Sequence, residues 1–372
     1  MARLEDVCKK ATSNIAQKDL AEHNGDYPIY GASGFIKNVD FYQQESPYIA
    51  VVKDGAGIGR VMKLPAKSSV IGTMQYIIPN DAVDISYLAY AMEHMNLSKY
   101  FTGATIPHIY FKNYQKEELP LPPLDEQRKI AAVMDKVSDL IAKRRQQLDK
   151  LDEMVKARFV EMFGDFKINT MRWPVVDFTE IAIIDGNMTT DYKKYANYPH
   201  IGIDSIEKET GRLTGYRTVA EDGVISGKYV FTSRHIIYSK IRPNLNKVAL
   251  PEFDGLCSAD AYPILPIAER CNRTFLAYNM RSQFFLDYIL QFCNRTNLPK
   301  VNRKEVSSFK TPLPPIELQN HFASFVEQTD KTKNVINRSL KSLEILKEAL
   351  MQEYFEKEGK TYECYLFNRK WI

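Results

Sequence analysis

The sequence predicts an α+β protein in which two repeated α/β domains are separated and joined by two long antiparallel helices that form a coiled coil. Three observations lead to this fold class: the chain length, a motif that occurs twice, and a periodic run behind each copy. A chain of 372 residues is too long for one ordinary domain and suits two domains, each with its own core. The apolar fraction of 44% and the charged fraction of 26% are typical of a soluble globular protein.

A proline-rich motif followed by an apolar-periodic run is the most informative feature. The first copy reads Leu-Pro-Leu-Pro-Pro-Leu-Asp-Glu-Gln at 119–127, and the second reads Thr-Pro-Leu-Pro-Pro-Ile-Glu-Leu-Gln at 311–319. Acidic residues follow each Pro-Pro pair, and they suit the first turn of a helix because they oppose its dipole. We therefore expect one long helix in residues 121–163 and a second in residues 313–358.

Shorter matches link the segments that precede the two helices. Their order along the chain is preserved and their spacing only grows, which marks an internal repeat with insertions in the second copy. The repeat predicts one domain in residues 1–120, a second in residues 164–312, a tail in residues 359–372, and an approximate two-fold axis. The matching segments are 27–31 with 198–202, 55–61 with 242–248, 88–90 with 276–278, and 105–109 with 297–301.

Each predicted domain combines strands with a helical patch. Short β-rich runs such as residues 48–52 and 236–238 alternate with glycine and proline clusters, which favour turns. A helical patch follows in each domain, at residues 85–100 and 273–291. Both domains are therefore expected to be mixed α and β.

The apolar residues of the two long runs are spaced alternately by four and three, which indicates a coiled-coil seam. About 40 residues at about 1.5 Å each would give a rod of about 60 Å. A single such helix would expose its apolar stripe, so we expect the two helices to pack on each other. The alternative is that each helix packs on its own domain. The residues expected at the helix–helix contact are Ile130, Met134, Val137, Ile141, Leu148, Leu151, Val155, Phe322, Val326, Ile336, Leu340, Leu343 and Leu350.

Composition narrows the class of protein further. The chain has no run of about 18 apolar residues and no apolar signal region at its start, so neither a membrane span nor export is expected. The five cysteines form no CxxC pair, which favours reduced thiols in a cytoplasmic protein. The net charge of +4 is low for a protein that binds DNA alone, and the positive excess lies in residues 164–312. DNA binding would therefore require clustered charge or partner subunits.

A glycine-rich segment at 54–60, Asp-Gly-Ala-Gly-Ile-Gly-Arg, resembles a nucleotide-binding loop, but we reject that interpretation. Its spacing is GxGxG, not GxGxxG, and the residues that follow are not a helix start. The equivalent segment of the second domain, 242–247, reads Arg-Pro-Asn-Leu-Asn-Lys and contains no glycine. A tight loop that presents different side chains accounts for both copies.

Catalytic and metal-binding motifs are missing from the sequence. We find no P-loop, HExxH, GxSxG or zinc-type spacing, and the six histidines are scattered. Acid pairs such as Asp204 with Glu207 and Asp254 with Asp260 are expected by chance in a chain with this many acids. The sequence therefore predicts no catalytic residue and no metal site in this chain.

Three sets of residues are candidates for contact with nucleic acid, because arginine and asparagine read guanine and adenine edges and lysine binds phosphate. For any one residue a solvated surface side chain is the ordinary alternative, but their alignment between the two domains favours function. The first set is Lys53, Arg60 and Lys63 with Lys240, Arg242, Asn244, Asn246 and Lys247; the second is Thr105, His108 and Lys112 with Lys300 and Arg303; the third is Lys193 and Lys194.

The chain closely resembles the specificity subunit of type I restriction-modification systems. The resemblance rests on the pattern L-P-x-P-P-x-x-x-Q-x-x-(I/F)-A at Leu119–Ala131 and on Thr311–Ala323, where threonine replaces the first leucine, with the elements Gly55–Val61 and Thr105–Ile109 ahead of the first helix. It covers essentially the whole chain. One departure is that the first domain is slightly acidic, which leaves open how tightly it binds DNA by itself.

The resemblance implies that residues 1–120 and 164–312 are target recognition domains, each reading one half of a bipartite double-stranded DNA site. It implies that the helices set the spacer and dock two methyltransferase subunits, and that restriction subunits join the full complex. S-adenosylmethionine, ATP and magnesium would then belong to the partners, and this chain would be a non-catalytic subunit that serves DNA methylation and bacterial defence. The alternatives are a non-catalytic protein-binding scaffold and a self-contained nuclease or methyltransferase.

Overall fold

A computed structural model describes residues 1–103, 107–293 and 299–356 of the chain. The chain divides into two compact units. The first unit combines Met1–Gln146 with the chain from Asn337 onward, and the second unit is Gln147–Ile336. Each unit thus contains part of both long helices, whereas the sequence suggested a linear series of domains and helices.

The first unit contains two sheets and a short strand pair. Its four-stranded antiparallel sheet has the order β2-β8-β5-β6, and its three-stranded sheet has the order β4-β3-β7, in which β3 and β7 are parallel. Strands β1 and β9 form the pair. The elements are β1 (Ala2–Arg3), α1 (Leu4–Val7), β2 (Cys8–Thr12), η1 (Gln17–Leu20), β3 (Tyr27–Gly31), β4 (Gly34–Val39), β5 (Tyr48–Val52), β6 (Val61–Leu64), β7 (Ser69–Val70), β8 (Met74–Pro79), α2 (Ile85–His94), η2 (Leu97–Tyr100), α3 (Phe111–Tyr114) and β9 (Glu118–Leu119).

The second unit repeats this plan with additions. Its four-stranded sheet has the order β11-β19-β16-β17, its five-stranded sheet the order β12-β15-β18-β13-β14, and β10 pairs with β20. The elements are β10 (Val175–Asp177), η3 (Phe178–Glu180), β11 (Ala182–Ile184), β12 (Met188–Thr189), β13 (Pro199–Ile201), η4 (Ile203–Ser205), β14 (Arg217–Thr218), α5 (Val219–Asp222), β15 (Lys228–Phe231), β16 (Ile236–Ser239), η5 (Pro243–Leu245), β17 (Val248–Ala249), β18 (Gly255–Cys257), β19 (Ala261–Pro266), α6 (Arg273–Arg281), α7 (Gln283–Leu290), α8 (Arg303–Ser307) and β20 (Lys310–Pro312).

The shared plan confirms the predicted fold class of two repeated α/β domains with two long helices. In both units the four-stranded sheet is antiparallel, the second sheet contains one parallel strand pair, and a helix follows the sheets. The extra strands of the five-stranded sheet account for the insertions that the growing spacing indicated. The two-fold axis concerns how the units are placed, and it stays a prediction.

The long helices are α4 (Leu124–Phe163) and α9 (Ile316–Phe355). Each begins immediately after its Pro-Pro pair and not before it, as the predicted ranges 121–163 and 313–358 had it, because proline disfavours the helical conformation of the residue that precedes it. Residues 357 and 358 of the second range, like the predicted tail at 359–372, lie outside the described residues. Among the residues described, no helix is long and apolar enough to cross a membrane.

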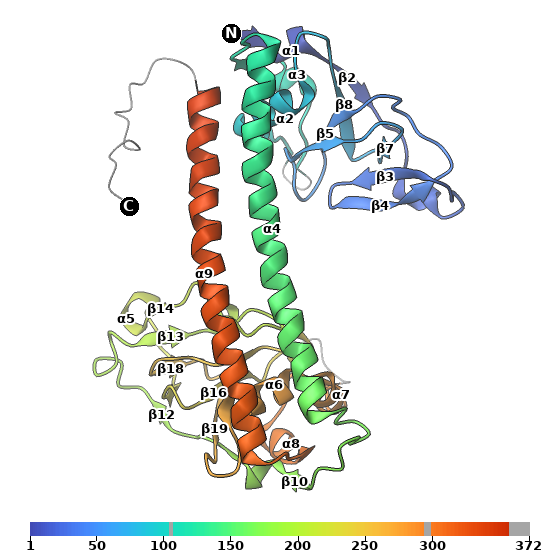
Figure 1. The fold of residues 1–372 in the computed structure, drawn as a ribbon. Coiled ribbons are helices and arrows are strands. Elements are labelled where there is room, and N and C mark those ends of the chain that lie inside the picture. The colour runs from blue at the N-terminus through green and yellow to red at the C-terminus, as the bar shows by residue number, and fades with distance from the viewer. Residues whose placement is uncertain (104–106, 294–298, 357–372) are drawn as a thin grey trace, which may run out of the picture. The chain divides into compact units, whose positions relative to one another are not determined.

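In the second unit α4 and α9 lie side by side and run antiparallel (Figure 1). The Phe163 ring lies 5.4 Å from the Phe322 ring near the start of α9, and the Asp152 carboxylate, earlier in α4, lies 2.6 Å from the ammonium of Lys333. As the residue number falls along α4 it rises along α9, which is the pattern of antiparallel helices.

The same pairing occurs in the first unit. Arg145 on α4 donates a hydrogen bond of 2.7 Å to Glu344 on α9, and Met134 shares a hydrophobic core with Met351 and Phe355. This core also contains residues of the sheet and of α2. The expected helix–helix packing and its alternative, packing on the domain, are therefore both present: the helices pair, and their ends enter the domain cores.

Burial of the seam residues differs between the two helices. Most of the α4 seam residues are buried, whereas the α9 seam residues after Val326 are only half-buried. The buried seam residues are Met134, Val137, Ile141, Leu148, Val155, Phe322 and Val326, and the half-buried ones are Ile130, Leu151, Ile336, Leu340, Leu343 and Leu350.

The glutamine of each proline-rich motif makes equivalent hydrogen bonds in the two units. Gln127 is 1% exposed and Gln319 is fully buried. The side-chain oxygen of Gln127 accepts from the amide of Asp84, the residue that caps α2, and its nitrogen donates to the carbonyl of Pro122. Gln319 makes the same bonds to Asn272, the cap of α6, and to Pro314. Each glutamine thus fixes the start of a long helix to its domain.

Breaking the ion pair of Lys333 is expected to destabilise the second unit. The Lys333 ammonium is only 12% exposed and pairs with Asp152 at 2.6 Å and Asp330 at 3.3 Å. We expect Asp152→Asn to lower the free energy of unfolding by about 3 kcal/mol, because it leaves a buried cation poorly paired. Urea unfolding measures the change. As a control, Glu344→Gln breaks an exposed ion pair and should cost less than about 1 kcal/mol.

The pH dependence of this pair has a defined sign. Burial lowers the pKa of Lys333, but the hydrogen bond and charge of Asp152 outweigh burial and raise the pKa above its ordinary 10.5. A raised pKa means that the stabilisation is complete below pH 10.5 and is lost as the pH rises through the pKa of the folded protein. A difference between wild type and Asp152→Asn that persists at pH values above that pKa would contradict this account.

Candidate nucleic-acid interface

In the first unit, two loops that carry predicted residues are joined by backbone hydrogen bonds. The turn between β5 and β6 contains Lys53 and Gly55, and the segment before α3 contains Pro107 and Ile109. The Gly55 amide donates to the Pro107 carbonyl at 3.1 Å, and the Ile109 amide donates to the Lys53 carbonyl at 2.9 Å. We call these two segments the loop pair of the first unit.

The second unit has an equivalent loop pair. The Arg242 amide donates to the Pro299 carbonyl at 2.8 Å, and the Val301 amide donates to the Lys240 carbonyl at 2.9 Å. These four residues occupy the positions of Gly55, Pro107, Ile109 and Lys53 in the internal repeat. The structure thus brings together, in each unit, described parts of the two segments that the sequence singled out separately.

Both turns use left-handed backbone at matching positions. Gly55 and Gly59 have φ values of 79° and 82°, and their counterparts Arg242 and Asn246 both have φ of 47°. Asparagine tolerates this conformation, whereas arginine is strained there by about 1–2 kcal/mol. The second unit therefore accepts strain to place a guanidinium where the first has a glycine, which fits a turn that presents different side chains and not a phosphate cradle.

Positive charge gathers beside the loop pair of the second unit. The ammonium of Lys240 lies 5.1 Å from the centre of the Tyr262 ring, and the guanidinium of Arg303 lies 5.9 Å from it. Lys300 forms an ion pair of 2.8 Å with Asp260. Burial, and then the charge of Lys300, lower the pKa of Lys240. This cationic cluster, Lys240, Lys300 and Arg303, contains one carboxylate and suits a phosphate.

The remaining residues of the second loop pair divide between exposed and buried. Arg242 and Asn244 are exposed. Asn246 is only 8% exposed, and its side-chain nitrogen donates to the Arg281 carbonyl at 2.7 Å. This burial contradicts the expectation that the Asn246 amide is free to face DNA. Lys247 is half-buried and donates to the Ile203 carbonyl at 2.8 Å, so it too holds the loop to the fold.

The cations of the first unit are also bonded to the protein. Arg60 donates to the Ala32 carbonyl at 2.8 Å, and Lys63 donates to the Ser86 hydroxyl at 2.7 Å. Burial lowers the pKa of Lys53, and the nearby charge of Lys10 lowers it further. Cations of both units are thus engaged with the protein, since Arg303 of the second unit also donates to the Ile184 carbonyl at 2.8 Å. The difference in charge lies in the composition of residues 1–120, which is slightly acidic.

Other predicted residues lie at or beyond the edges of the loop pairs. Lys112 is exposed in α3 and lies over the Tyr110 ring at 5.3 Å. Lys193 and Lys194 are exposed between β12 and β13, away from the loop pair in sequence. Thr105 lies outside the described residues.

Sequence reasoning missed several residues of these sites. His108 was predicted, but its hydrogen-bond partner Asp54 was not, although it follows Lys53 directly. Asp260 was dismissed as part of a chance acid pair, and Tyr262 gave no signal because it is part of strand β19. A carboxylate beside a predicted lysine was the one signal that pointed to Asp54.

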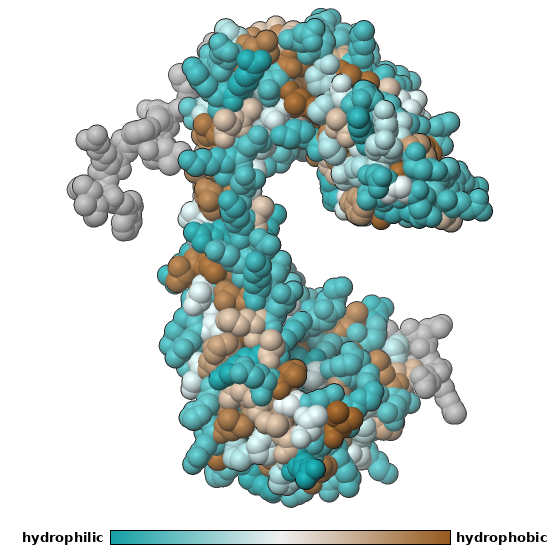
Figure 2. Space-filling view, turned by 45° about the vertical axis from the view of Figure 1, so that its right-hand side comes forward, coloured by the Kyte–Doolittle hydropathy of each residue, from teal (hydrophilic) through white to brown (hydrophobic). Residues whose placement is uncertain are grey.

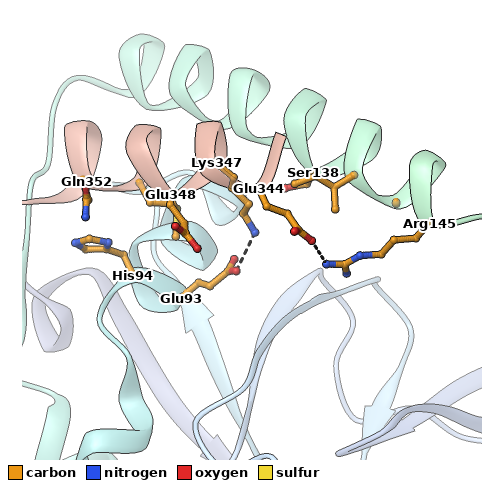
Figure 3. A pocket seen from close by; sticks show the side chains of 11 residues that line it. Glu93, His94, Ser138, Arg145, Glu344, Lys347, Glu348 and Gln352 are labelled. Atoms are coloured by element: carbon orange, nitrogen blue, oxygen red, sulfur yellow. Dashed lines mark hydrogen bonds and ion pairs between the residues drawn. The ribbon is translucent and has the colours of Figure 1, made fainter. Parts of the chain in front are cut away.

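Each unit also has a groove beside the long helices. The groove of the first unit lies between α4, α9 and α2, whereas that of the second unit is lined by α4, α6, α7 and the loops that carry Thr210 and Asn244. The groove of the first unit, about 730 Å³, contains the ion pairs Glu93–Lys347 and Arg145–Glu344 (Figure 3). The groove of the second unit, about 610 Å³, is lined in part at equivalent repeat positions. The corresponding residues are Glu344 and Asp152, Glu348 and Lys156, Met351 and Phe159, Gln352 and Val160, Glu93 and Arg281, and His94 and Ser282. The two grooves therefore share the wall of one long helix and the end of a short helix, whereas the other long helix lines only the first groove.

Exposed apolar side chains stand among polar ones on the rest of the surface that Figure 2 shows, which is mostly hydrophilic. Val160 at the rim of the second groove is 58% exposed, so this groove presents apolar as well as charged surface.

Comparison of this chain with known proteins finds matches to one protein family. A sequence model described as the type I restriction modification DNA specificity domain matches residues 1–152 and 172–345. The type I restriction enzyme EcoDI specificity subunit of Escherichia coli is 26% identical, over 95% of this chain and 87% of that protein. The MjaVIII specificity subunit of Methanocaldococcus jannaschii is 24% identical, over 86% of this chain and 81% of that protein.

A solved structure shares the fold. The S subunit of a type I restriction-modification system from M. genitalium superposes with a TM-score of 0.63 at 13% identity, covering 96% of both chains.

Proposed function

Because this chain belongs to the family of type I restriction-modification specificity subunits, we propose that it selects the DNA site of such an enzyme and carries out no catalytic step itself. The observation that carries the proposal is the loop pair that each unit builds at equivalent positions with different side chains. Two similar scaffolds with different loops suit a target with two different halves. Each target recognition domain would read one half-site of double-stranded DNA.

Recognition would combine two kinds of contact. Exposed Arg242 and Asn244 can donate hydrogen bonds to base edges in the major groove, which is where sequence is read. The cationic cluster would bind phosphate and fix the register of the domain on the duplex. The first domain, whose residues 1–120 are slightly acidic, would depend more on partner subunits for its contacts with the backbone.

Partner docking is the second part of the proposal. The two grooves share a wall of repeat-equivalent residues, which would suit two copies of one partner, and in this family's enzymes that partner is the methyltransferase subunit. Restriction subunits would join the full complex. S-adenosylmethionine, ATP and magnesium would be bound by those partners in the cytoplasm, where this chain supplies specificity and the helices set the spacing.

Salt dependence of DNA binding tests the proposal. We expect Lys240→Ala/Lys300→Ala/Arg303→Ala, assembled with its methyltransferase subunits, to reduce the slope of log affinity against log salt by about 2–3, because each lost phosphate contact removes about 0.9. Fluorescence anisotropy of a labelled duplex measures the slope. Lys331→Ala, which removes a lysine on α9 that pairs with Glu327, is the matched control and should leave the slope unchanged. An unchanged slope in the triple variant would favour the protein-binding scaffold.

A further inference from the structure

The two loop pairs are each closed by a side-chain acid–base pair. In the first unit His108 hydrogen-bonds to Asp54 through its Nδ1 atom. In the second unit Lys300, at the repeat position of His108, pairs with Asp260 at 2.8 Å. The backbone at these positions also matches, because isolated β-bridges join Asp54 to His108 and Ile241 to Lys300.

Each of the two acid–base pairs closes its loop pair, but the acids come from different positions in the repeat. Asp54 is part of the β5–β6 turn itself, whereas Asp260 lies directly before β19 and its carbonyl accepts from the Lys240 amide. The threonine at the position of Asp260 in the first unit, Thr73, likewise accepts from the Lys53 amide through its carbonyl. The acid has thus changed place between the units while the base has kept its position, which indicates that the link matters more than either acid.

The residues around His108 hold its imidazole in one orientation toward Asp54. His108 and Asp54 are both half-buried, the Tyr110 ring lies 4.1 Å from the imidazole, and the Lys53 ammonium lies 3.8 Å from Asp54. Backbone hydrogen bonds in both directions join His108 to Thr102, at 2.8 and 2.9 Å. The imidazole is therefore held by the Tyr110 ring, by the hydrogen bonds of its own backbone and by the Asp54 carboxylate. Because Asp54 is part of the β5–β6 turn, these contacts also restrict the motion of that turn.

We propose that His108 with Asp54, and Lys300 with Asp260, are positioning residues that hold each loop pair in the geometry that reads its half-site. The inference rests on the proposed function, and it names the side chains on which the precision of base recognition depends. Hydrogen bonds to bases require donor positions correct to a few tenths of an ångström, and a turn on the protein surface does not keep them without such links. The pair of His108 with Asp54 would act without touching DNA, whereas Lys300 also belongs to the cationic cluster proposed to bind phosphate.

The test separates positioning from folding and from base contact. The chain is assembled with its methyltransferase subunits, and methylation of a library with randomised half-sites is sequenced. We expect His108→Ala to reduce the preference for the correct bases of the first half-site about ten-fold and to leave the second unchanged. Lys300→Ala should show the reverse pattern. His108→Lys should restore most of the first preference, since lysine closes the loop pair of the second unit.

Three outcomes would overturn the inference. The first is an unchanged first half-site in His108→Ala, and the second is an equal loss at both half-sites, which would indicate a general defect. The third is failure of His108→Lys to restore the preference while its urea unfolding matches the wild type. These results are distinct from failure of the proposed function, which the salt slope of the triple variant tests without reference to base preference.

Discussion

Phe163→Ala is expected to lower the free energy of unfolding by about 3–5 kcal/mol. The Phe163 side chain is fully buried, and its ring lies 5.0 Å from Phe275 of α6 and 5.4 Å from Phe322 of α9. Its removal would leave a cavity at the point where both long helices meet the sheet of the second unit. Equilibrium unfolding in urea, followed by tryptophan fluorescence, measures the change, and Trp173 reports locally because its indole donates to the Phe163 carbonyl.

The internal repeat supplies a matched variant for the first unit. Phe355 near the end of α9 occupies the position of Phe163, and its ring lies 5.1 Å from Tyr87, the counterpart of Phe275. We expect Phe355→Ala to cost a similar amount, which would show that the end of α9 closes a core built mainly from the start of the chain. Val160→Ala, at a site 58% exposed, is the control and should change stability by less than about 0.5 kcal/mol. A loss below about 1 kcal/mol in both phenylalanine variants would contradict the packing described.

The repeat and the long helices were predictable because they depend on local pattern. Apolar spacing of three and four residues marks a helix with one buried stripe whatever covers that stripe. The pattern does not show which residues bury the stripe. Met134 and Phe322 are buried by domain cores as well as by the partner helix. The glutamine of the motif was visible in the sequence, but its role appears only when Asp84 and Asn272 come within hydrogen-bond reach.

The loop residues were predictable by type and only partly by role. Arg242 and Asn246 look alike in a one-dimensional pattern, yet one is exposed and the other holds the turn to α6. The difference is set by the direction of each side chain from a left-handed backbone, which a sequence does not show. The partner of Lys300 could not be predicted from the first domain, because the acid lies at a different position in each.

Lengthening both long helices is expected to change the DNA site itself. Four residues inserted between Gln146 and Gln147 of α4, together with four between Ile336 and Asn337 of α9, would add about 6 Å to each helix. Base pairs are stacked about 3.4 Å apart, so the unread gap should grow by one or two base pairs. The bases recognised in each half-site should stay the same, because both insertions lie at the boundary between the units and leave the loop pairs untouched.

Sequencing of methylated DNA measures the gap, and the antiparallel pairing dictates the control. Because Arg145 faces Glu344 on one side of the insertion and Asp152 faces Lys333 on the other, an insertion in α4 alone would keep only one of these contacts in register. We therefore expect the single insertion to lose methylation and stability, whereas the double insertion keeps both and moves the half-sites apart. A double insertion that methylates sites with the original gap would show that partner subunits, and not the helices, set the spacing.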